Sequence, residues 1–340
     1  MTSVPEDGDV HLAPDLRIRR VLNGMWQVSG AHGPIDPGAA VRAMVAYHDA
    51  GLTTWDLADH YGPAEDFVGA FRRQLAADRG EGVLAGVQAL TKWVPRPGPM
   101  TRKIVEENIA VSLRRMGVAA LDLLQFHWWD YGDARYREAL KHLSDLRAAG
   151  AIRCLGLTNF DTERLERIVA DGTPIVSNQV QYSLIDQRPA VRMAPFCAVH
   201  GIGLLAYGAL CGGLLSERYL NQPEPERAAL TTASLRKYKQ MVDAWGGWAL
   251  FQDLLSVLKE IADRHGVTIA TVALRATLDA PGVAGVIVGA RLGVAEHIAD
   301  TLRVFSLRLD PEDHERIAGV QARSRDLYSP IGDCGAEYRR

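Results

Sequence analysis

Four side chains that can carry, attract or relay a proton stand at the ends of three consecutive apolar segments of this 340-residue sequence. Asp56 lies near the end of the first of these segments, and Tyr61 follows shortly after it. The second segment ends in Lys92 and the third in His127. A phenol with its ordinary pKa of about 10 is a poor acid at neutral pH. An ammonium group about 4 Å away would favour the phenolate by about 4 kcal/mol at an effective dielectric constant near 20, before desolvation opposes it. These residue types therefore suit delivery of a proton by a tyrosine.

In such a site each of the four residues has a definite task. Lys92 would bring Tyr61 into the range in which a phenol donates a proton efficiently. Asp56 would hold Lys92 and offset the burial of its charge, while His127 could hydrogen-bond a substrate oxygen or relay a proton. Each residue alone also has an ordinary structural explanation, such as a packed histidine, a solvated lysine or a tyrosine in a turn. Their joint placement is what indicates catalysis.

Two other kinds of catalytic site lack their usual patterns in this sequence. The histidines are scattered without an HxxxH pair, and the cysteines have no zinc-type spacing, so we expect no metal. No GxSxG segment is present, which argues against a serine hydrolase with a nucleophile elbow.

The segments that must position these residues alternate between short apolar runs and amphipathic helical stretches. The runs predict eight strands, near Val21–Trp26, Thr53–Leu57, Val83–Lys92, Leu121–His127, Ile152–Thr158, Ile175–Gln179, Gly203–Tyr207 and Val283–Val288. Eight strands that are each followed by a helix predict a closed parallel (β/α)8 TIM barrel, whose active site lies at the carboxyl ends of the strands. The alternative, an open doubly wound sheet, lacks its GxGxxG fingerprint after the first strand.

Helices are predicted between the strands and after the last of them. They lie near Pro37–Ala50, Ala64–Ala77, Thr101–Met116, Ala134–Ala149, Thr162–Ala170, Arg188–His200, Phe251–His265, Thr268–Leu278, Ala295–Arg303 and Pro311–Ala322. Gly51 and Gly150 follow two helices as left-handed caps would, and Asp161 is a suitable N-cap. A long loop, 208–247, follows the seventh strand, and a C-terminal tail covers 322–340. We expect residues 1–340 to form a single domain with both segments near the mouth of the barrel.

Composition and charge exclude several classes of partner. The net charge is -3 with mixed signs along the chain, and no basic stripe indicates nucleic acid. No apolar run approaches the roughly 20 residues that a membrane span needs, and the polar N-terminus does not resemble a secretory signal. Four cysteines without close pairs are typical of a reducing cytoplasm. We therefore expect a cytoplasmic protein with a small-molecule substrate, while the oligomeric state is not predicted.

Six short motifs occur in an order and at spacings that resemble the aldo-keto reductase superfamily, in its bacterial and plant-type branches. They are Trp55–Gly62, Leu90–Lys92, Phe126–Trp128, Gly156–Phe160, Ser177–Ser183 and Ala206–Leu210. The resemblance implies a barrel that binds NADPH or NADH across its mouth and passes a hydride to an aldehyde or ketone. It also implies that Tyr61 is the acid and that Lys92 lowers its pKa. Asp56 would then support Lys92, and His127 would orient the carbonyl.

The same resemblance implies positions for the cofactor, one residue at a time. Thr158, Asn159 and Gln179 match the residues that hold the nicotinamide carboxamide, with Thr158 in place of the commoner serine. Tyr207 matches the aromatic residue that stacks on the nicotinamide ring. The backbone of Gly208–Gly212, which includes the cofactor-binding candidates Gly208 and Leu210, would run along the pyrophosphate, where glycines permit close approach.

After the eighth strand, Gly289 and Arg291 match the adenosine-phosphate loop, which leads into a helix N-terminus. This loop looks longer than is usual in the family, and the family's later Asn appears as Asp300 or Thr301. Arg291 is the candidate for the adenosine 2′-phosphate, because a guanidinium suits phosphate geometry. NADPH is therefore favoured, with NADH as the alternative.

Trp26 and Trp128 stand where the family places tryptophans of the substrate pocket, and Trp93 and Trp129 could line the same mouth. Aromatic walls with few polar anchors indicate aldehydes or ketones with apolar bulk. We therefore expect an NADP-dependent aldo-keto reductase in which a tyrosine is the proton donor. Two alternatives stay open: a dehydrogenase that oxidises a sugar or secondary alcohol, and a nicotinamide-binding regulatory subunit of the same fold. The natural substrate and the physiological direction are not predicted.

Overall fold

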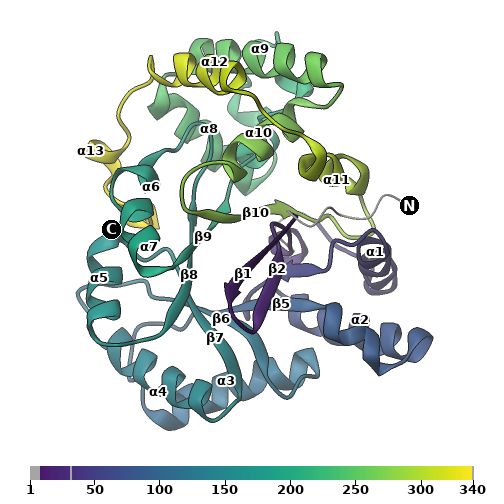
Figure 1. Ribbon diagram of the computed structural model, residues 1–340, viewed down its shortest axis with the longest axis vertical. Helices are drawn as coiled ribbons and strands as arrows, with labels where there is room; N and C mark the ends of the chain where they lie inside the picture. The colour runs from purple at the N-terminus through teal and green to yellow at the C-terminus, as the bar shows by residue number, and fades with distance from the viewer. Residues whose placement is uncertain (1–7, 31–32, 339–340) are drawn as a thin grey trace.

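A computed structural model describes residues 8–30 and 33–338 of the chain. Within them, parallel strands close into a barrel in the order β10-β3-β4-β5-β6-β7-β8-β9 (Figure 1). The strands are β3 (Val21–Gly24), β4 (Thr54–Asp56), β5 (Gln88–Trp93), β6 (Leu121–His127), β7 (Ile152–Thr158), β8 (Ile175–Gln181), β9 (Gly203–Tyr207) and β10 (Val283–Gly289). The predicted (β/α)8 barrel is confirmed.

Side chains alternate along each barrel strand between the interior and the surrounding helices, and β6 shows this pattern clearly. Leu124 and Phe126 pack in the large cluster beneath the helices, whereas Leu123 belongs to the small cluster inside the barrel. Gln125 and His127 share the alternation of Leu123, so they face the interior nearer the carboxyl end of the strand. The interior of the barrel thus changes from apolar to polar along β6.

A hairpin that the strand prediction missed covers the amino ends of the barrel strands. It consists of β1 (Asp9–Ala13) and β2 (Leu16–Arg19), paired antiparallel, and it crosses the centre of the barrel in Figure 1. Leu12, Leu16 and Ile18 pack in the same cluster as the leucines inside the barrel. The backbone at its tip also accepts a hydrogen bond from the beginning of β7. The apolar end of the interior is therefore shielded from water.

Helices surround the barrel and continue beyond it. They are α1 (Pro37–Asp49), α2 (Ala64–Arg79), α3 (Arg102–Met116), α4 (Tyr136–Ala148), α5 (Thr162–Ala170), α6 (Arg188–Val191), α7 (Met193–His200), α8 (Ala233–Trp245), α9 (Trp248–His265), α10 (Ile269–Leu278), α11 (Ile298–Ser306), α12 (Pro311–Gln321) and α13 (Tyr328–Ile331). Gly51 and Gly150 both have a φ of 84°, and Asp161 accepts a hydrogen bond from the backbone of Arg164 at the start of α5. These three predicted caps are confirmed.

Three predicted strands are shorter than expected, and one of them is β4, which covers only Thr54–Asp56 of the predicted Thr53–Leu57. The run Val83–Lys92 begins as the 3-10 helix Glu81–Gly86, and β5 starts only at Gln88. The one glycine inside this run, Gly86, weakens an extended strand, since it offers no side chain to pack. The first barrel strand ends at Gly24, and Trp26 begins a second 3-10 helix, η2 (Trp26–Val28).

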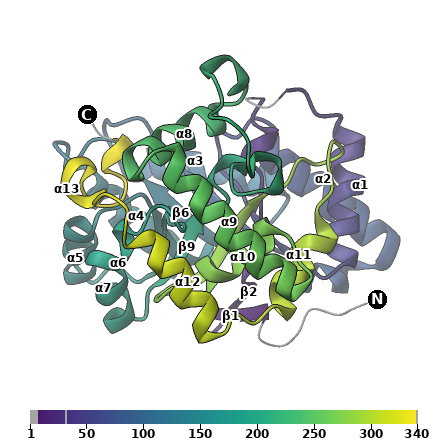
Figure 2. The same ribbon diagram turned by 90° about the horizontal axis from the view of Figure 1, so that it is seen from above.

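The long segment after β9 is a folded layer and not an irregular loop. It contains η4 (Cys211–Gly213), η5 (Glu217–Tyr219), η6 (Arg227–Ala229) and α8. Together with α9, α10 and α12 it forms a second hydrophobic cluster. Figure 2 shows helices α8, α9, α10 and α12 from above. In the part of the chain that the structure describes, no helix has the length and apolarity to cross a membrane. All four cysteines are free and buried.

Candidate active site

A buried ion pair joins the ends of β4 and β5. Lys92 Nζ lies 2.6 Å from Asp56 Oδ1 and donates a further hydrogen bond to the carbonyl oxygen of Leu57 at 3.0 Å. Lys92 is 2% exposed and Asp56 is 3% exposed. Burial lowers the pKa of Lys92, while the Asp56 carboxylate opposes that change. The structure thus brings together the two charged residues that the sequence associates.

Two buried amides complete the surroundings of Asp56. Its second oxygen, Oδ2, accepts hydrogen bonds from Gln125 Nε2 at 2.9 Å and from Gln179 Nε2 at 2.6 Å. Gln179 also donates to Gln125 Oε1 at 2.7 Å. Three donors therefore converge on one carboxylate and replace the water that it loses on burial. Gln125 is a site residue that the sequence prediction missed, although it shares the alternation of His127 on β6.

Tyr61 lies against the ammonium group of Lys92, in the turn between β4 and α2. Lys92 Nζ is 5.2 Å from the centroid of the Tyr61 ring, within the range of a cation–π contact. The indole of Trp26 meets this ring edge to face, with centroids 5.0 Å apart, and the His60 ring packs against it at 4.8 Å. Tyr61 is therefore placed between an aromatic wall and a buried cation.

His127 ends β6 and is 3% exposed. Its Nδ1 atom lies 3.0 Å from the carbonyl oxygen of Thr158. A carbonyl oxygen can only accept, so Nδ1 carries the proton, and in the neutral ring Nε2 is an acceptor. Trp129 packs against this imidazole with ring centroids 4.4 Å apart. The backbone of β7 thus holds His127 in one tautomer.

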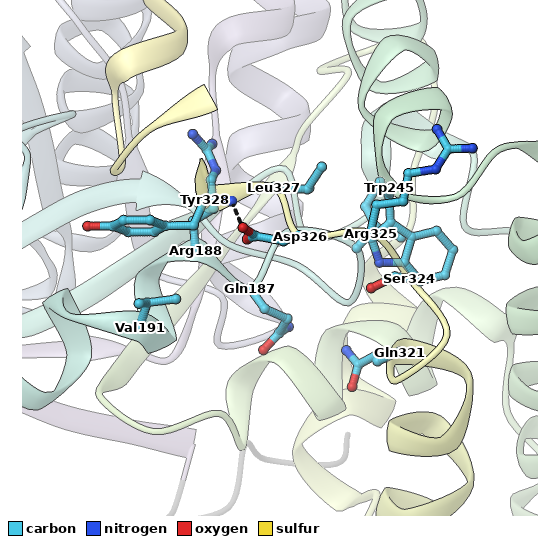
Figure 3. A pocket seen from close by; sticks show the side chains of 11 residues that line it. Gln187, Arg188, Val191, Trp245, Gln321, Ser324, Arg325, Asp326, Leu327 and Tyr328 are labelled. Atoms are coloured by element: carbon cyan, nitrogen blue, oxygen red, sulfur yellow. Dashed lines mark hydrogen bonds between the residues drawn. The ribbon is translucent and has the colours of Figure 1, made fainter. Parts of the chain in front are cut away.

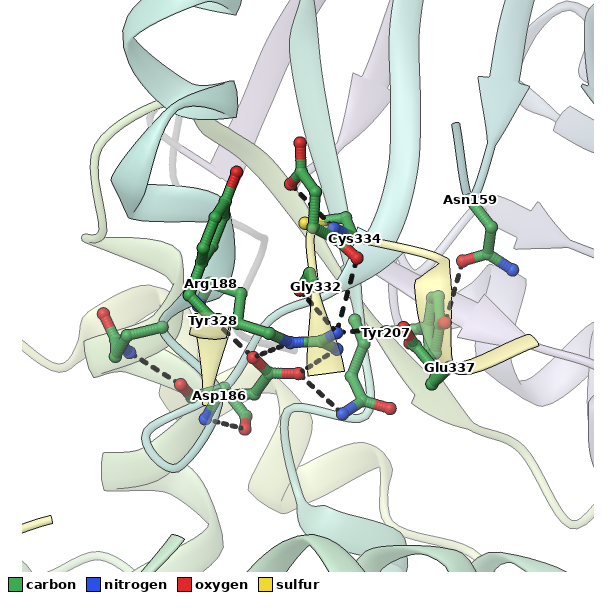
Figure 4. Close-up of polar contacts among 12 residues, drawn as sticks. Asn159, Asp186, Arg188, Tyr207, Tyr328, Gly332, Cys334 and Glu337 are labelled. Carbon is green, nitrogen blue, oxygen red and sulfur yellow. Dashed lines mark hydrogen bonds and ion pairs between the residues drawn. The ribbon is translucent and has the colours of Figure 1, made fainter. Parts of the chain in front are cut away.

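The residues that the resemblance assigns to the nicotinamide lie together at the ends of β7, β8 and β9. The Tyr207 hydroxyl donates to Asn159 Oδ1 at 2.8 Å (Figure 4). The backbone of Asn159 has a φ of 57°, and its N–H donates to the Gln179 carbonyl oxygen at 2.8 Å. Thr158 Oγ1 is buried and has no hydrogen-bond partner among the described residues. A buried hydroxyl in this state is suited to a polar group of a ligand.

Helix α8 packs on the backbone that the resemblance assigns to the pyrophosphate. Gly208 leaves β9 with a φ of 76°, a conformation that favours glycine. A Cβ atom at Gly208 would lie 2.2 Å from the Tyr238 hydroxyl oxygen. Leu210 contacts both the barrel cluster and the second cluster. Lys237 also comes from α8, and its Nζ atom is 5.1 Å from the centroid of the Tyr207 ring.

The segment after β10 places Gly289 inside the fold and Arg291 on its surface. A Cβ atom at Gly289 would lie 2.1 Å from Gln27 Nε2, so a larger residue there would require the Gln27 side chain to move. Arg291 is exposed, and its carbonyl oxygen accepts the Val294 N–H at 2.8 Å in a turn. The following helix begins at Ile298 and not near Ala295 as predicted. Arg291 therefore belongs to the turn before α11 and not to the first residues of α11.

The tryptophans that could line the mouth differ in exposure. Trp26 is 37% exposed and Trp129 is 41% exposed, whereas Trp128 is fully buried and Trp93 is 2% exposed. The Trp128 Nε1 atom donates to two backbone carbonyl oxygens of the following loop, at 2.7 and 2.9 Å. Of the two tryptophans predicted to contact the substrate, Trp26 is exposed and Trp128 packs in the core. Trp129 occupies the exposed position beside His127.

A cavity of about 340 Å³ lies against the C-terminal tail, and none of the predicted site residues lines it (Figure 3). The buried guanidinium of Arg188 donates to both oxygens of Asp186, at 2.8 and 2.7 Å, and to Glu337 at 3.0 Å (Figure 4). These bonds fix the tail to the loop after β8. In the described part of the chain, no group of three or more His, Cys, Asp or Glu side chains could hold a metal ion.

Comparisons with known proteins agree with this geometry. Residues 20–322 match the model of the Aldo/keto reductase family. Aldo-keto reductase YhdN of Bacillus subtilis is 27% identical over 323 residues, which is 92% of each chain. Flagellar radial spoke protein 5 of Chlamydomonas reinhardtii is 32% identical over 254 residues, which is 64% of this chain. The match spans only 47% of the length of that algal protein.

The fold is also shared with solved structures. An aldo/keto reductase from Klebsiella pneumoniae, solved in complex with NADP and acetate, matches with a TM-score of 0.65 and 24% identity. The match covers 90% of this chain and 92% of the Klebsiella chain. Because the family model covers most of the sequence, including every strand of the barrel, the chain belongs to the aldo/keto reductase family.

Proposed function

We propose that the chain is an NADP-dependent oxidoreductase that reduces an aldehyde or ketone to the alcohol, with Tyr61 as the proton donor. The observation that carries this proposal is the buried Lys92–Asp56 pair, whose ammonium group lies 5.2 Å from the centroid of the Tyr61 ring. Removing two charges from water is costly, and such pairs in a cleft are candidates for functional groups. Membership of the aldo/keto reductase family supports the same class of reaction.

The ion pair accounts for the acidity that Tyr61 needs. The Lys92 cation favours the phenolate, so it lowers the pKa of Tyr61 from the ordinary value of about 10. A more acidic phenol is a better donor to a carbonyl oxygen that gains negative charge during reduction. Asp56 keeps Lys92 in place and charged, because burial alone would favour the neutral amine.

His127 acts in the tautomer that β7 imposes. With the proton held on Nδ1 by the Thr158 carbonyl oxygen, neutral His127 offers Nε2 as an acceptor. In this form it can hold the hydroxyl group of the alcohol or accept a proton in a relay. Only the imidazolium form could donate to a carbonyl oxygen from Nε2, so orientation of the carbonyl by His127 requires the protonated ring.

The residues present fit a nicotinamide cofactor, which when bound supplies or accepts the hydride. The buried Thr158 hydroxyl, without a partner among the described residues, is available to the carboxamide. Gln179 already donates to Asp56 and Gln125, so its Oε1 atom is the part left to accept a carboxamide N–H. Asn159 and Tyr207 complete this group. We propose NADPH as the cofactor, with NADH as the alternative, because the exposed Arg291 suits a 2′-phosphate and the Klebsiella relative binds NADP.

The two exposed indoles indicate the class of substrate. Trp26 lies beside Tyr61 and Trp129 beside His127, so the reacting carbonyl would sit between aromatic walls. Such walls favour aldehydes and ketones with apolar bulk over small hydrophilic ones. The opposite direction, oxidation of an alcohol by the same residues, is distinguished by comparing kcat/KM for both directions at equal pH.

The test of this proposal is the turnover of Tyr61→Phe with NADPH and a panel of aldehydes. Turnover is measured as the loss of reduced-nicotinamide absorbance. Removal of the phenol oxygen should lower kcat by at least about 100-fold, because general acid catalysis contributes 100- to 10,000-fold. NADPH binding, measured by fluorescence, should stay within about twofold, since only the hydroxyl is removed. Full turnover by Tyr61→Phe would show that another group is the acid.

A further inference from the structure

We propose that Arg115, on the neighbouring helix α3, is a positioning residue that sets the place of Tyr61 over Lys92. This inference rests on the proposed function, in which Tyr61 donates the proton. The guanidinium of Arg115 donates hydrogen bonds to backbone and carboxylate oxygens of this region. It acts through the backbone of the turn Asp59–Gly62, in which Tyr61 lies.

The guanidinium of Arg115 bridges both ends of this turn. Nη1 donates to the carbonyl oxygen of Asp59 at 3.0 Å, and Nη2 donates to the carbonyl oxygen of Gly62 at 2.5 Å. The two accepting residues stand on either side of Tyr61 in the sequence. Because a guanidinium is a rigid planar fork, its two nitrogens hold the two carbonyl groups at a fixed separation. A single donor could not impose this spacing.

Arg115 is itself held by two carboxylates at the start of α2. Nη1 donates to Glu65 Oε2 at 3.0 Å, and Nη2 donates to Asp66 Oδ2 at 2.8 Å. Glu65 is fully buried, and its other oxygen accepts a hydrogen bond from the Thr91 hydroxyl at 2.8 Å. Thr91 precedes Lys92 on β5. The same guanidinium is thus connected to the strand that carries the cation and to the turn that carries the phenol.

The helices approach closely enough for this contact because of one glycine. Gly69 of α2 faces the end of α3, and a Cβ atom there would lie 2.2 Å from the backbone oxygen of Arg115. Any larger residue would push the two helices apart, since real Cβ atoms do not come this near to backbone oxygen. The place of Arg115 is therefore built into the packing of α2 on α3.

The first residue of the turn, Asp59, is also hydrogen-bonded to β5 and to the residue that follows it. The Asp59 N–H donates to the Lys92 carbonyl oxygen at 3.0 Å, and Asp59 Oδ2 accepts the Val94 N–H at 3.2 Å. Asp59 therefore ties the beginning of the turn to the strand of Lys92, and Arg115 ties both of its ends to α3. Without Arg115, the end at Gly62 loses a charged partner and Tyr61 can move relative to Lys92.

Such a movement should affect catalysis more than binding. Proton transfer depends steeply on distance, and a displacement of about 1 Å can reduce a rate by about 100-fold. Tyr61 should also become less acidic when it moves away from the Lys92 cation. The rate of carbonyl reduction falls when the acid loses its proton, so a higher pKa of Tyr61 moves this loss to higher pH. A purely structural arginine would not shift the pH profile.

The experiment compares Arg115→Ala and Arg115→Lys with Arg114→Ala as the matched control, because Arg114 is the exposed neighbour on α3. For each we would measure kcat and KM with one aldehyde from pH 6 to 10, the NADPH dissociation constant and the melting temperature. Arg115→Ala should lose about 10- to 100-fold in kcat with its NADPH affinity unchanged within about twofold. Its alkaline limb should move to higher pH. Arg115→Lys keeps the charge but not the fork, so its kcat should be intermediate.

Added guanidinium ion gives a second readout, because the Arg115 side chain is partly exposed and its site can be reached from solvent. Millimolar guanidinium should raise the kcat of Arg115→Ala and leave Arg114→Ala unchanged. If Arg115→Ala does not fold, the proposal is tested with Arg115→Lys alone. A lowered kcat with an alkaline limb at higher pH would support it, and a kcat and pH profile equal to those of the wild type would refute it.

The results separate the two proposals. If Tyr61→Phe is inactive while Arg115→Ala and Arg115→Lys keep the kcat and pH profile of the wild type, the role of Arg115 is refuted and that of Tyr61 stands. If both Arg115 variants lose kcat without a shift of the alkaline limb and without rescue, Arg115 is only structural. If Tyr61→Phe retains full turnover, the proposed function itself is wrong.

Discussion

Removing one charge of the Lys92–Asp56 pair should damage both stability and turnover, whereas removing both charges should restore stability alone. In Asp56→Asn the ammonium group loses a carboxylate oxygen 2.6 Å away. At an effective dielectric constant near 20, that distance corresponds to about 6 kcal/mol of attraction, from which the cost of burying both charges must be subtracted. Asparagine keeps one oxygen for the amides of Gln125 and Gln179, while its NH2 group replaces the oxygen that accepts from Lys92, so the change removes the charge and this hydrogen bond together.

We expect Asp56→Asn and Lys92→Met each to lower the free energy of unfolding by about 3–5 kcal/mol, because each leaves a buried charge without its partner. The double variant has neither charge and should unfold within about 2 kcal/mol of the wild type. Urea unfolding followed by circular dichroism gives these free energies. A coupling energy near zero in this double-mutant cycle would refute the idea that the two side chains form a charged pair.

The pH dependence of the free energy of unfolding of Asp56→Asn tests the sign of this electrostatic effect. Burial already lowers the pKa of Lys92, and loss of the carboxylate should lower it further. Between this lowered pKa and the unfolded value of about 10.4, the unfolded chain binds more protons, so stability rises with pH. The deficit of Asp56→Asn should therefore shrink between neutral pH and pH 10. All three variants should lose at least about 100-fold in kcat, because Lys92→Met and the double variant remove the cation beside Tyr61 and Asp56→Asn favours the neutral amine of Lys92. Recovery of turnover in the double variant would contradict this reasoning.

Four further substitutions test the rest of the site. Gln125→Leu should lower the free energy of unfolding in urea by about 1–3 kcal/mol, because buried groups of Asp56 and Gln179 lose a partner; no change would show that Gln125 is dispensable. Thr158→Val should leave the stability of the free protein almost unchanged but weaken NADPH binding by about 3- to 10-fold in a fluorescence titration, with Thr158→Ser as the control that retains the hydroxyl. Arg291→Ala should raise the dissociation constant for NADPH by about 10- to 100-fold and leave that for NADH nearly the same; equal effects on both would argue against a contact with the 2′-phosphate. Trp129→Ala should lower kcat/KM for bulky aromatic aldehydes more than for small ones, and an equal loss for both would remove Trp129 from the substrate pocket.

The barrel and its main polar residues could be predicted because both follow from local rules. Parallel strands place their carboxyl ends on one rim, so residues that end successive strands must be neighbours. Asp56, Lys92 and His127 meet this condition, and each ends or nearly ends its strand in the structure. The caps at Gly51 and Asp161 follow from local backbone chemistry in the same way.

Other features depend on contacts between segments that are distant in sequence, which local patterns do not reveal. Arg115 looks like an ordinary charged residue at the end of a helix, and only the close packing of α2 on α3 brings it to the turn of Tyr61. Helix α8 likewise folds because it packs on α9 and its neighbours in the second cluster. The sequence pattern predicts one long loop, 208–247, over this segment.

Two features that differ from the prediction do have a signal in the sequence. The segment around Pro14-Asp15 has apolar residues at alternate positions on both sides of a turn former, which is the pattern of a hairpin. The adjacent Trp128 and Trp129 could have been separated by the same alternation. His127, at the end of β6, faces the interior of the barrel. Trp128 therefore points outward into the core beneath the helices, and Trp129 lies at the mouth.

The most direct measurement for the whole account is the ionisation of the Tyr61 phenol itself. The difference in ultraviolet absorbance between the wild type and Tyr61→Phe, recorded against pH, isolates the titration of this one tyrosine. If the Lys92 ammonium makes Tyr61 an effective acid, the phenolate signal should appear well below the ordinary midpoint of about pH 10, and the shift should vanish in Lys92→Met. A midpoint at or above pH 10 in the wild type, unchanged in Lys92→Met, would contradict it.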